Sequence, residues 1–535
     1  MTTPSLVQLG RNDDAAAPVA GAFDPSAPVA VRVHPDDDVA VAVHPLAAGT
    51  AVAVEGARVT LVDDVPAGHK FALHALGVGA PVRKYGFVIG AATAGVAAGA
   101  WVHAHNLATR LGGPLEYGYH PGARPGAPAP GATVPAFDGY RRRDGRVGTR
   151  NEVWIINTVG CVNTAAERIA RAAAERHARP GGTVDGVYAF AHPYGCSQLG
   201  DDLVNTQRVL AGLLRHPNAG GVLVLGLGCE NNQMQQLLAL AADGSPTGLD
   251  PARLRFFNTQ DVVDEVEAGV ELVGELAAAM AGDRREPCPV TDLVLGHKCG
   301  GSDGFSGITA NPLLGRLADR LTALGGRVVL SEVPEMFGAE QVLMDRATTE
   351  GVFGEEVAMV NDFKTYFLRH DQPVYENPSP GNKAGGLTTL EEKSLGAIQK
   401  GGRAPVTDVR RYGAPVRPES AGGLTLVEAP GNDGVSCTAM TAAGATMLLF
   451  TTGRGTPLGF PVPTVKVSSN SDIARRKPHW IDFDAGRLLG GGASLDGLAD
   501  ELLAFVLDVA SGRVLANNER HGYREIAIWK VGVTL

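Results

Sequence analysis

The chain has 535 residues, of which 44% are hydrophobic and 70 are glycine, and its formal net charge at pH 7 is −10. This composition is typical of two to four packed domains of roughly 100–200 residues each, and it excludes a fibrous or disordered chain. The acidic balance argues against a surface for nucleic acid or anionic membranes, although a local basic pocket remains compatible with it.

The N-terminal segment has no targeting signal that we can identify. The first 30 residues lack the basic start and the continuous apolar core of a signal peptide, and no later run of about 18 apolar residues could span a bilayer. Residues 1–27, rich in Ala, Pro, Asp and Gly, predict a flexible tail. The six cysteines have no close regular spacing. We therefore expect a cytoplasmic protein with reduced thiols.

Short alternating strands begin at Val29, in VAVRVHP, DVAVAVHPL, TAVAV and RVTLVDDV, separated by Gly, Pro and Asp turns. They continue to VHAHN at 102–106 and predict a small β-rich domain over residues 28–108. If VHAHN is a strand, His103 and His105 point to the same face, where they could share a metal, a substrate or a proton. The Pro- and Gly-rich residues 109–137 predict an extended linker.

After the linker the pattern changes to strand, loop, helix. VWIINTV, GVYAF and GGVLVLGLG are predicted strands, each followed by a loop and a helix, and Asp261 is the predicted N-cap of the helix that follows RLRFFNTQ. This alternation predicts largely parallel sheets with right-handed crossovers. The charged segment GDRREPCPV at 282–290 predicts a boundary between one α/β domain over 138–285 and another over 286–535.

Four of the six cysteines follow a predicted strand and precede a helix, where open parallel sheets bind ligands: Cys161, Cys196, Cys229 and Cys299. A helix N-terminus stabilises the thiolate, which is the metal-binding form. Glu230 follows Cys229, while His192 and Tyr194 precede Cys196, and thiolates beside imidazole and carboxylate suit iron or zinc. No CxxC pair is present, and small buried cysteines in tight turns explain the same pattern.

Two glycine-rich loops carry side chains suited to an oxyanion. ENPSPGNKAGG at 376–386 offers Asn377, Ser379, Asn382 and Lys383 among glycines that let the backbone approach a ligand. TTGRGTPLG at 451–459 adds Arg454 and Thr456, and arginine suits bidentate binding of a carboxylate. Neither is a Walker A loop or a GxGxxG fingerprint, so nucleotide binding is weakly supported, and an exposed Gly-rich turn is the alternative for each.

The HxH pair is also a weak motif when taken alone. Its alternative is a surface strand with imidazoles in solvent. It lacks the HExxH spacing of a zinc protease, and the chain has no G-x-S-x-G elbow that would make either histidine the base of a serine hydrolase.

Longer motifs are spread from about residue 28 to the C-terminus: GHKFAL, VRKYGFVIG, VHAHN, TVGCVN, YGCSQLGDD, GLGCENNQ, GGSDGFSGITANP, SEVPEMFGAEQ, NDFKTYF, HDQPVYENPSPGNKAGGLTTLEEKSLG, LFTTGRGTP, VPTVK and HWIDFDAG. On these motifs the chain resembles the altronate and galactarate dehydratase family. The galactarate branch is expected to lack VHAHN and to differ after YGC, so the resemblance favours the altronate branch.

The resemblance implies an N-terminal β-clip domain of the SAF type followed by two catalytic regions. It also implies dehydration of D-altronate to 2-dehydro-3-deoxy-D-gluconate in hexuronate breakdown, with divalent iron or manganese. Galactarate, or another aldarate or aldonate, is an alternative substrate, and a non-catalytic sugar-acid binding protein is an alternative function. The expected partner is a small-molecule sugar acid, with no nucleic acid and no membrane, and a homo-oligomer is compatible with the sequence.

Loss of water from a 2,3-dihydroxy acid needs a base for the C2 proton, an acid for the C3 hydroxyl and stabilisation of the enediolate. A divalent metal would supply that stabilisation, and the candidate ligands are Cys161, Cys196, Cys229, Glu230 and Cys299. Lys383 or Arg454 would bind the carboxylate. We expect His103 or His105 to move the proton, with His192 as an equal rival and Tyr194 beside it. The sequence does not separate base from acid. Nor does it decide whether the cysteines hold mononuclear iron, an iron–sulfur centre or nothing.

Overall fold

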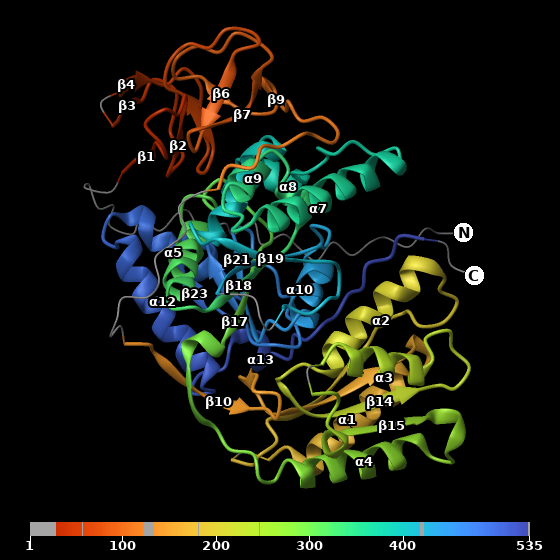
Figure 1. Ribbon diagram of the computed structural model, residues 1–535. Coiled ribbons are helices and arrows are strands. Elements are labelled where there is room, and N and C mark those ends of the chain that lie inside the picture. The colour runs from red at the N-terminus through yellow and green to blue at the C-terminus, as the bar shows by residue number, and fades with distance from the viewer. Residues whose placement is uncertain are drawn as a thin grey trace, which may run out of the picture.

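The computed structural model describes residues 28–55, 57–121, 133–179, 181–245, 247–417 and 422–532. Within them the chain forms three domains: the first at one end of the molecule, the third in the middle and the second at the other end (Figure 1). The predicted tail over 1–27 and residues 122–132 of the predicted linker lie outside the described residues. In the part of the chain that the structure describes, no helix is both long and apolar enough to cross a bilayer.

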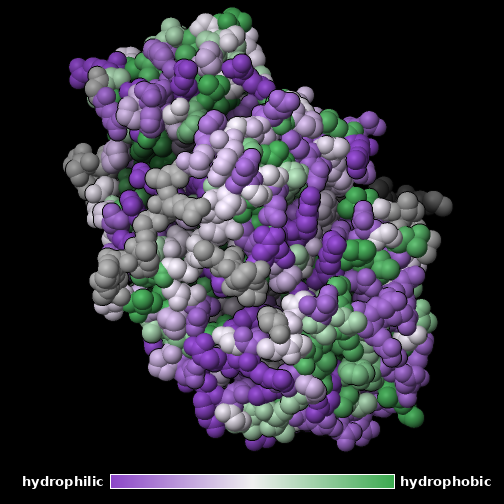
Figure 2. All heavy atoms as spheres, viewed as in Figure 1, coloured by the Kyte–Doolittle hydropathy of each residue, from purple (hydrophilic) through white to green (hydrophobic). Residues whose placement is uncertain are grey.

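The first domain consists of short antiparallel strands: β1 (Ala30–Val31), β2 (Val39–Ala42), β3 (Ala51–Val54), β4 (Ala57–Thr60), β5 (Lys70–Ala72), β6 (Pro81–Lys84), β7 (Phe87–Ala92), β8 (Trp101–Val102) and β9 (Leu107–Ala108). They pair as β1-β2-β5-β8, β6-β7-β9 and β3-β4. Exposed and buried residues alternate along β3 and β6, as expected for strands with one face in the core. The domain forms a separate lobe on the molecular surface (Figure 2).

The condition that VHAHN is a strand is not met. β8 ends at Val102 and β9 begins at Leu107, and the four residues between them form a turn. Asn106 closes this turn, because its N–H donates to the carbonyl of His103 (3.0 Å) and its side-chain oxygen accepts from the N–H of His103 (2.9 Å). The same-face argument for a strand therefore does not apply to His103 and His105, although both rings contact Trp101.

The second domain has strands β12 (Glu152–Asn157), β13 (Gly186–Phe190), β14 (Ala219–Gly226) and β15 (Leu254–Asn258) and helices α1 (Asn163–His177), α2 (Gly200–Leu214), α3 (Met234–Asp243) and α4 (Glu265–Ala279). The strands are parallel in the order β13-β12-β14-β15. α1 and α4 pack on one face and α2 and α3 on the other, so β12 and β14 are buried on both sides. The predicted N-cap of α4 is wrong: Asp264, and not Asp261, accepts from the first backbone N–H groups.

The segment predicted as a boundary is itself a strand. β10 (Ala136–Arg141) pairs antiparallel with β16 (Glu286–Pro289) and with β11 (Val147–Gly148), which gives the sheet order β11-β10-β16. The last residues of the predicted linker and the residues before the third domain therefore lie side by side.

The third domain has strands β17 (Val294–Cys299), β18 (Arg327–Leu330), β19 (Val406–Arg410), β20 (Gly423–Val427), β21 (Met447–Thr452), β22 (Thr464–Ser468) and β23 (Phe483–Asp484). Its helices are α5 (Ala310–Ala323), α6 (Glu340–Met344), α7 (Glu350–Arg369), α8 (Pro380–Ala384), α9 (Leu390–Ala397), α10 (Asp433–Ala442), α11 (Ser471–Arg476), α12 (Leu495–Ala510) and α13 (Asn517–Arg520). The sheet is parallel in the order β19-β20-β18-β17-β21-β22-β23. The predicted fold class, a β-rich domain before two α/β regions with largely parallel sheets, is confirmed.

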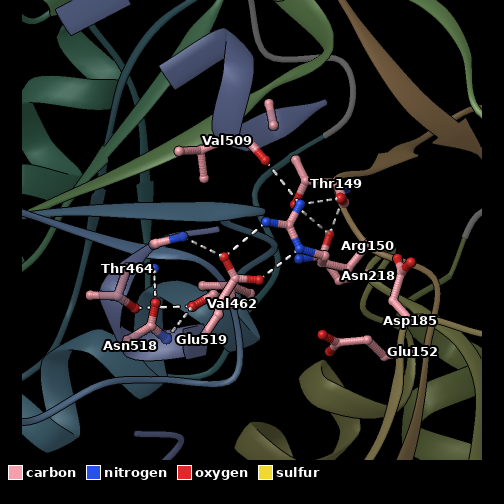
Figure 3. A network of polar contacts seen from close by, with 12 residues as sticks. Thr149, Arg150, Glu152, Asp185, Asn218, Val462, Thr464, Val509, Asn518 and Glu519 are labelled. Atoms are coloured by element: carbon pink, nitrogen blue, oxygen red, sulfur yellow. Dashed lines mark hydrogen bonds and ion pairs between the residues drawn. The ribbon is translucent and has the colours of Figure 1, made fainter. Parts of the chain in front are cut away.

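The second and third domains share a core and a buried ion pair. Residues of α2 and α10 belong to one hydrophobic cluster. Beside it, the guanidinium of Arg150 donates to both carboxylate oxygens of Glu519 (2.6 and 2.8 Å) and to the carbonyl of Val509 (2.9 Å) (Figure 3). Asn218 accepts from the N–H of Thr149 (2.9 Å) and donates to the carbonyl of Thr446 (3.1 Å). These contacts hold the two domains in one orientation.

Candidate active site

The carboxyl edge of the third-domain sheet contains a topological switch point. From β17 the chain runs through α5 to β18 on one side of β17, whereas β20 connects through α10 to β21 on the other side. The loops that leave β17 and β21 thus diverge, and open α/β sheets bind ligands in the crevice at such a point. Residues 300–304 and 453–455 form this crevice, and the first domain lies over it, because the carbonyl of Gly68 contacts Gly304 and Gly386.

A cavity of about 890 Å³ opens between the first and third domains at this edge. The first domain contributes residues 43–45 and Ala67 to its wall. The polar side chains on the third-domain wall are Asp303, Arg454, Asn470, Ser471, Asp472 and three further arginines, Arg475, Arg476 and Arg487. The cavity is large enough for a six-carbon acid.

Asp303 is the buried carboxyl of this wall. Its Oδ1 accepts from the N–H and the hydroxyl of Ser306 (2.9 and 2.8 Å) and from the hydroxyl of Ser469 (2.8 Å), while Oδ2 accepts from Asn470 (3.0 Å). Burial raises the pKa of Asp303 above its usual range against the effect of these hydrogen bonds. A Cβ on Gly453 would lie 2.1 Å from the Asp303 carboxyl carbon, so only glycine permits this approach.

Arg454 is exposed, and within the described residues it has no carboxylate partner. The other arginines of the wall are paired: Arg475 and Arg476 with Asp472 (2.9 and 2.7 Å), and Arg487 with Glu501 (2.7 Å). Arg454 is therefore the wall arginine with a guanidinium available for an acidic ligand.

The segment from Ala384 to Thr388 lies between Asp303 and the first domain. On one side, a Cβ on Gly385 would be 3.1 Å from the Asp303 Cβ. On the other, His69 contacts the carbonyl of Ala384 (3.3 Å), Lys70 donates to the Thr388 hydroxyl (2.5 Å), and His103 Nδ1 lies 3.3 Å from the same hydroxyl. His103 thus reaches the third domain, as predicted for one member of the pair.

His103 is half-buried and stacks on Trp101, with ring centroids 5.3 Å apart. Burial, followed by the charge of Lys70, lowers the pKa of His103 to about 4. Its imidazole is therefore neutral at physiological pH and able to accept a proton. His105 is exposed, and its ring is tilted against that of Trp101 with centroids 5.2 Å apart. The structure gives the two histidines different surroundings.

A buried ionic cluster fixes the first domain on the third. Lys70 of β5 and Lys84 of β6 both donate to the carboxylate of Glu392 on α9, at 2.8 and 2.9 Å. Burial lowers the pKa of Lys70 to about 8, whereas for Lys84 the Glu392 carboxylate outweighs burial and raises the pKa. Although burial opposes it, the two lysines lower the pKa of Glu392 to about 2. All three groups are thus held charged at neutral pH by one another.

Comparison with known proteins agrees with this arrangement of domains. The family model described as altronate/galactarate dehydratase SAF domain matches residues 28–110. The model of the D-galactarate dehydratase/altronate hydrolase second domain matches 139–281, and that of the D-galactarate/altronate dehydratase C-terminal region matches 290–534.

An altronate dehydratase of Escherichia coli (strain K12) is 52% identical over 490 residues, covering 92% of this chain and 96% of the relative. The chain belongs to the altronate/galactarate dehydratase family. An altronate dehydratase of Bacillus subtilis (strain 168) is 49% identical, covering 91% and 96% of the two chains. A galactarate dehydratase (L-threo-forming) of Escherichia coli (strain K12) is 32% identical, covering 88% and 90%.

In this altronate/galactarate dehydratase family member, the predicted oxyanion loop at 376–386 is partly a helix, α8, with Ser379 as its N-cap. Asn382 accepts from the Ser379 hydroxyl (2.9 Å) and donates to the carbonyl of Ser302 (2.8 Å), and Asn377 accepts from Lys393 (3.0 Å). These side chains hold the loop beside Asp303. Lys383 is partly exposed and adjacent to the cavity residue Ala384, and its ammonium forms no ion pair with the residues that the structure describes.

Thr456 follows Arg454 in the second predicted loop, and its hydroxyl accepts from the N–H of Leu458 (3.2 Å). Thr456 therefore shapes the turn after Arg454. The structure places Arg454 on the cavity wall, Lys383 one residue before the cavity residue Ala384, and His103 against Thr388 of the same segment. Their roles as substrate-binding and proton-transfer residues stay predictions.

The second-domain residues of the predicted site lie elsewhere, at the carboxyl edge of the four-stranded sheet. Cys161, Cys196 and Cys229 are exposed there on three loops that hydrogen bonds join. The N–H of Gly160 donates to the carbonyl of Tyr194 (2.8 Å), and the N–H of Asn232 donates to the carbonyl of Gly195 (2.9 Å). This edge and the first domain lie in different parts of the molecule (Figure 1).

Two of the predicted side chains on these loops are occupied by internal contacts. His192 is buried, with Nε2 bonded to the carbonyl of Asn157 (2.9 Å) and Nδ1 accepting from the N–H of Tyr194 (3.2 Å). Glu230 accepts from Thr158 and from the N–H of Gly228 (2.7 Å). Although burial opposes it, these bonds lower its pKa. This geometry argues against His192 as the base. Tyr194 lies on the same second-domain loop as His192, so it is also remote from His103 in the first domain.

The structure separates the predicted metal ligands: Cys161, Cys196, Cys229 and Glu230 lie in the second domain and Cys299 lies in the third. Cys299 ends β17 in the third domain, buried, with its sulfur 2.9 Å from the Ser302 hydroxyl. Among the described residues, no group of three or more His, Cys, Asp or Glu side chains is arranged to hold a metal ion. The residues therefore do not fit a preformed site for iron or manganese.

Asp303, Asn470, Lys70 and Glu392 belong to the site but were not among the residues predicted for it. Asp303 stands in GGSDG directly after a predicted strand, so the positional rule that selected Cys299 also points to it. Lys70 and Glu392 carry no local signal, because the burial that makes them notable comes from the docking of two domains.

Proposed function

We propose that this protein is a hydro-lyase that converts D-altronate to 2-dehydro-3-deoxy-D-gluconate and water. The observation that carries the proposal is the similarity to two altronate dehydratases, 52% and 49% identical over more than nine tenths of the chain. The galactarate dehydratase is less similar, at 32%. The cavity at the switch point, with one buried carboxyl, one unpaired arginine and a neutral imidazole nearby, supports this chemistry.

In this proposal the substrate carboxylate binds Arg454. His103 takes the C2 proton, and the electron pair of that C–H bond forms the C1–C2 enediolate. The enediolate then expels the C3 hydroxyl, which leaves as water with a proton from Asp303, and the resulting enol becomes the 2-keto acid. The Thr388 hydroxyl can accept from both Lys70 and the Nδ1–H of His103, and that tautomer leaves Nε2 to act as the base.

The charges of the cavity favour an acid with one carboxylate. The arginines at 475, 476 and 487 already pair with aspartate or glutamate, which leaves Arg454 for the ligand. A second carboxylate at the far end of an aldarate would find no free arginine on this wall. This supports altronate over galactarate as the substrate.

Divalent iron or manganese remains a prediction from the family resemblance. Such an ion would stabilise the enediolate through the carboxylate and C2 hydroxyl. Because the described residues present no preformed ligand set, no step above depends on it. The three exposed thiols of the second domain are the residues that an iron–sulfur centre would use. A cytoplasmic location, a role in hexuronate breakdown and a homo-oligomeric state stay predictions as well.

Turnover assays with D-altronate and galactarate test the proposal directly. We expect the purified protein to form a 2-keto acid, followed by its ultraviolet absorbance, from D-altronate with a higher kcat/KM than from galactarate. No keto acid from either substrate, while the acid still binds, would leave a sugar-acid binding protein as the function. A preference for galactarate would reassign the substrate.

We expect His103→Ala to lower kcat by about 10²-fold or more, because it removes the proposed base. His105→Ala is the matched control and should change kcat little, since His105 is exposed in the same turn. In the wild type, kcat/KM should show no decline attributable to this imidazole between pH 7 and pH 5, because a pKa of about 4 keeps it neutral. Normal turnover in a variant with both histidines replaced by alanine would rule out the pair.

Anaerobic purification followed by iron, manganese and sulfide analysis tests the metal prediction. The family resemblance predicts about one divalent ion per chain without sulfide, and activity that follows ferrous ion content. The described residues, which present no preformed ligand set, predict activity without that ion. Stoichiometric sulfide would instead indicate an iron–sulfur cluster. Its loss in a variant with Cys161, Cys196 and Cys229 changed to serine would assign that cluster to the second domain. Full activity in metal-free protein would contradict the metal requirement.

A further inference from the structure

A second polar cavity, of about 190 Å³, lies at the opposite edge of the second-domain sheet from the cysteine loops. Its wall consists of the hairpin after β10, the end of α2, the loop after α3 and the start of β15. Six arginines and three aspartates line it, which gives these groups a net formal charge of +3: Arg141, Arg142, Arg143, Arg146, Arg215 and Arg253, with Asp144, Asp250 and Asp283.

Most of these charges are already paired. Arg253 binds Asp283 at 2.7 Å, and Arg142 lies 3.6 Å from the same carboxylate. Arg146 binds Asp144 at 2.6 Å. Arg141 binds Glu286 and Asp292, at 2.7 and 3.1 Å. Asp250 caps a helical turn by accepting from the N–H of Ala252.

Arg215 is the buried exception. Only 9% of the residue is exposed, and within the described ranges no carboxylate forms an ion pair with its guanidinium. Burial and the positive charge of Arg146 lower its pKa to about 10. A Cβ on Gly244 would lie 2.7 Å from one guanidinium nitrogen, so glycine at this position leaves the space that the group occupies. A buried cation without a counter-ion is costly unless a ligand supplies the anion.

We propose that this cavity binds a small phosphate-bearing anion, with Arg215 as its buried ligand and Arg143 at its exposed rim. Guanidinium groups match the geometry of phosphate oxygens, and a volume near 190 Å³ accommodates a phosphate or a short phosphorylated sugar. Arg143, like Arg215, has no acidic partner in the part of the chain that the structure describes.

Occupation of this cavity would reinforce the junction between the second and third domains. His216, the residue after Arg215, contacts the carbonyl of Ala445 across the junction (3.0 Å). Asn218 donates to the carbonyl of Thr446 nearby. The expected effect of the anion is therefore on stability, and the proposal does not depend on the identity of the dehydration substrate.

The test is a thermal-unfolding titration of the full chain with inorganic phosphate and, separately, with glucose 6-phosphate, at constant ionic strength maintained with sodium chloride. We expect phosphate to raise the Tm of the wild type by several degrees, as for a ligand present well above its Kd. Arg215→Met keeps the apolar stem but removes the charge, so its Tm should not respond. The matched control is Arg171→Gln, at an exposed arginine of α1 that forms no ion pair with any residue the structure describes, and it should respond like the wild type.

The same titration separates ligand binding from a structural role. Without phosphate, the Tm of Arg215→Met should equal or exceed that of the wild type, because an unpaired buried cation has been removed. A lower Tm together with an unchanged phosphate response would overturn the proposal.

Arg143→Gln provides a second test that leaves the interior intact, and its apparent Kd for phosphate should be at least about tenfold weaker. A tighter response to glucose 6-phosphate identifies a sugar phosphate as the ligand, and an equal one identifies free phosphate.

Discussion

Asp303→Asn should lower kcat for D-altronate by about 10²–10⁴-fold, which is the range expected when a general acid or base is removed. The carboxyl is buried at the switch point, faces the cavity and has a raised pKa, so it can hold a proton for the departing C3 hydroxyl. An amide of the same shape cannot donate that proton and regain it. Because Arg454 still binds the carboxylate, KM should change much less than kcat.

Asp472→Asn is the matched control for Asp303. Asp472 lines the same cavity, but it is exposed and pairs with Arg475 and Arg476. Its replacement should leave kcat close to that of the wild type. A thermal-unfolding curve of each variant shows whether the fold is intact. If folded Asp303→Asn protein turns over normally, Asp303 is not the acid, and the proposed site at the switch point is wrong.

The fold could be predicted from the sequence because its signals are local. β14 is a continuous apolar run and is buried along almost its whole length, as expected for a parallel strand covered on both faces. The loop that follows each such strand marks the carboxyl edge of its sheet, so this edge could be located from the sequence alone. The N-cap of α4 was misplaced by three residues because Asp261 and Asp264 are both plausible caps, and Asp261 belongs to a short 3-10 turn, Thr259–Asp261, that precedes α4.

The site was harder to predict because it depends on contacts between domains. His103 and Thr388 are 285 positions apart in the chain, and no spacing rule connects them. Cysteines are conspicuous in a sequence, so they attracted the metal prediction, whereas the two sheets place Cys299 away from Cys161, Cys196 and Cys229. The position of a residue directly after a predicted strand correctly indicated that it lies at the carboxyl edge of a sheet. It did not indicate which of the two sheet edges the first domain would cover.

Glu392→Gln should destabilise the docking of the first domain by about 3–5 kcal/mol, because it leaves Lys70 and Lys84 buried without their carboxylate. In the wild type, Glu392 has a pKa of about 2, below the usual value near 4.5. Its contribution is therefore fully present above about pH 4.5 and is lost as the pH falls toward 2. The variant should unfold, or expose its first domain to protease, at a lower urea concentration than the wild type at pH 7, and this difference should shrink in acid.

Glu391→Gln is a matched control one residue away. Glu391 is also buried, but it accepts from the Thr109 hydroxyl (2.8 Å) and the Arg110 N–H (2.7 Å), and no lysine depends on it. Its loss should reduce the stability of domain docking much less.

Because the Lys70 and Glu392 contacts hold the segment that ends at Thr388, Glu392→Gln should also lower kcat, through displacement of His103. If docking and kcat are both unchanged in Glu392→Gln, the apolar contacts of the first domain, and not the ionic cluster, position this domain. The same contacts would then also position His103.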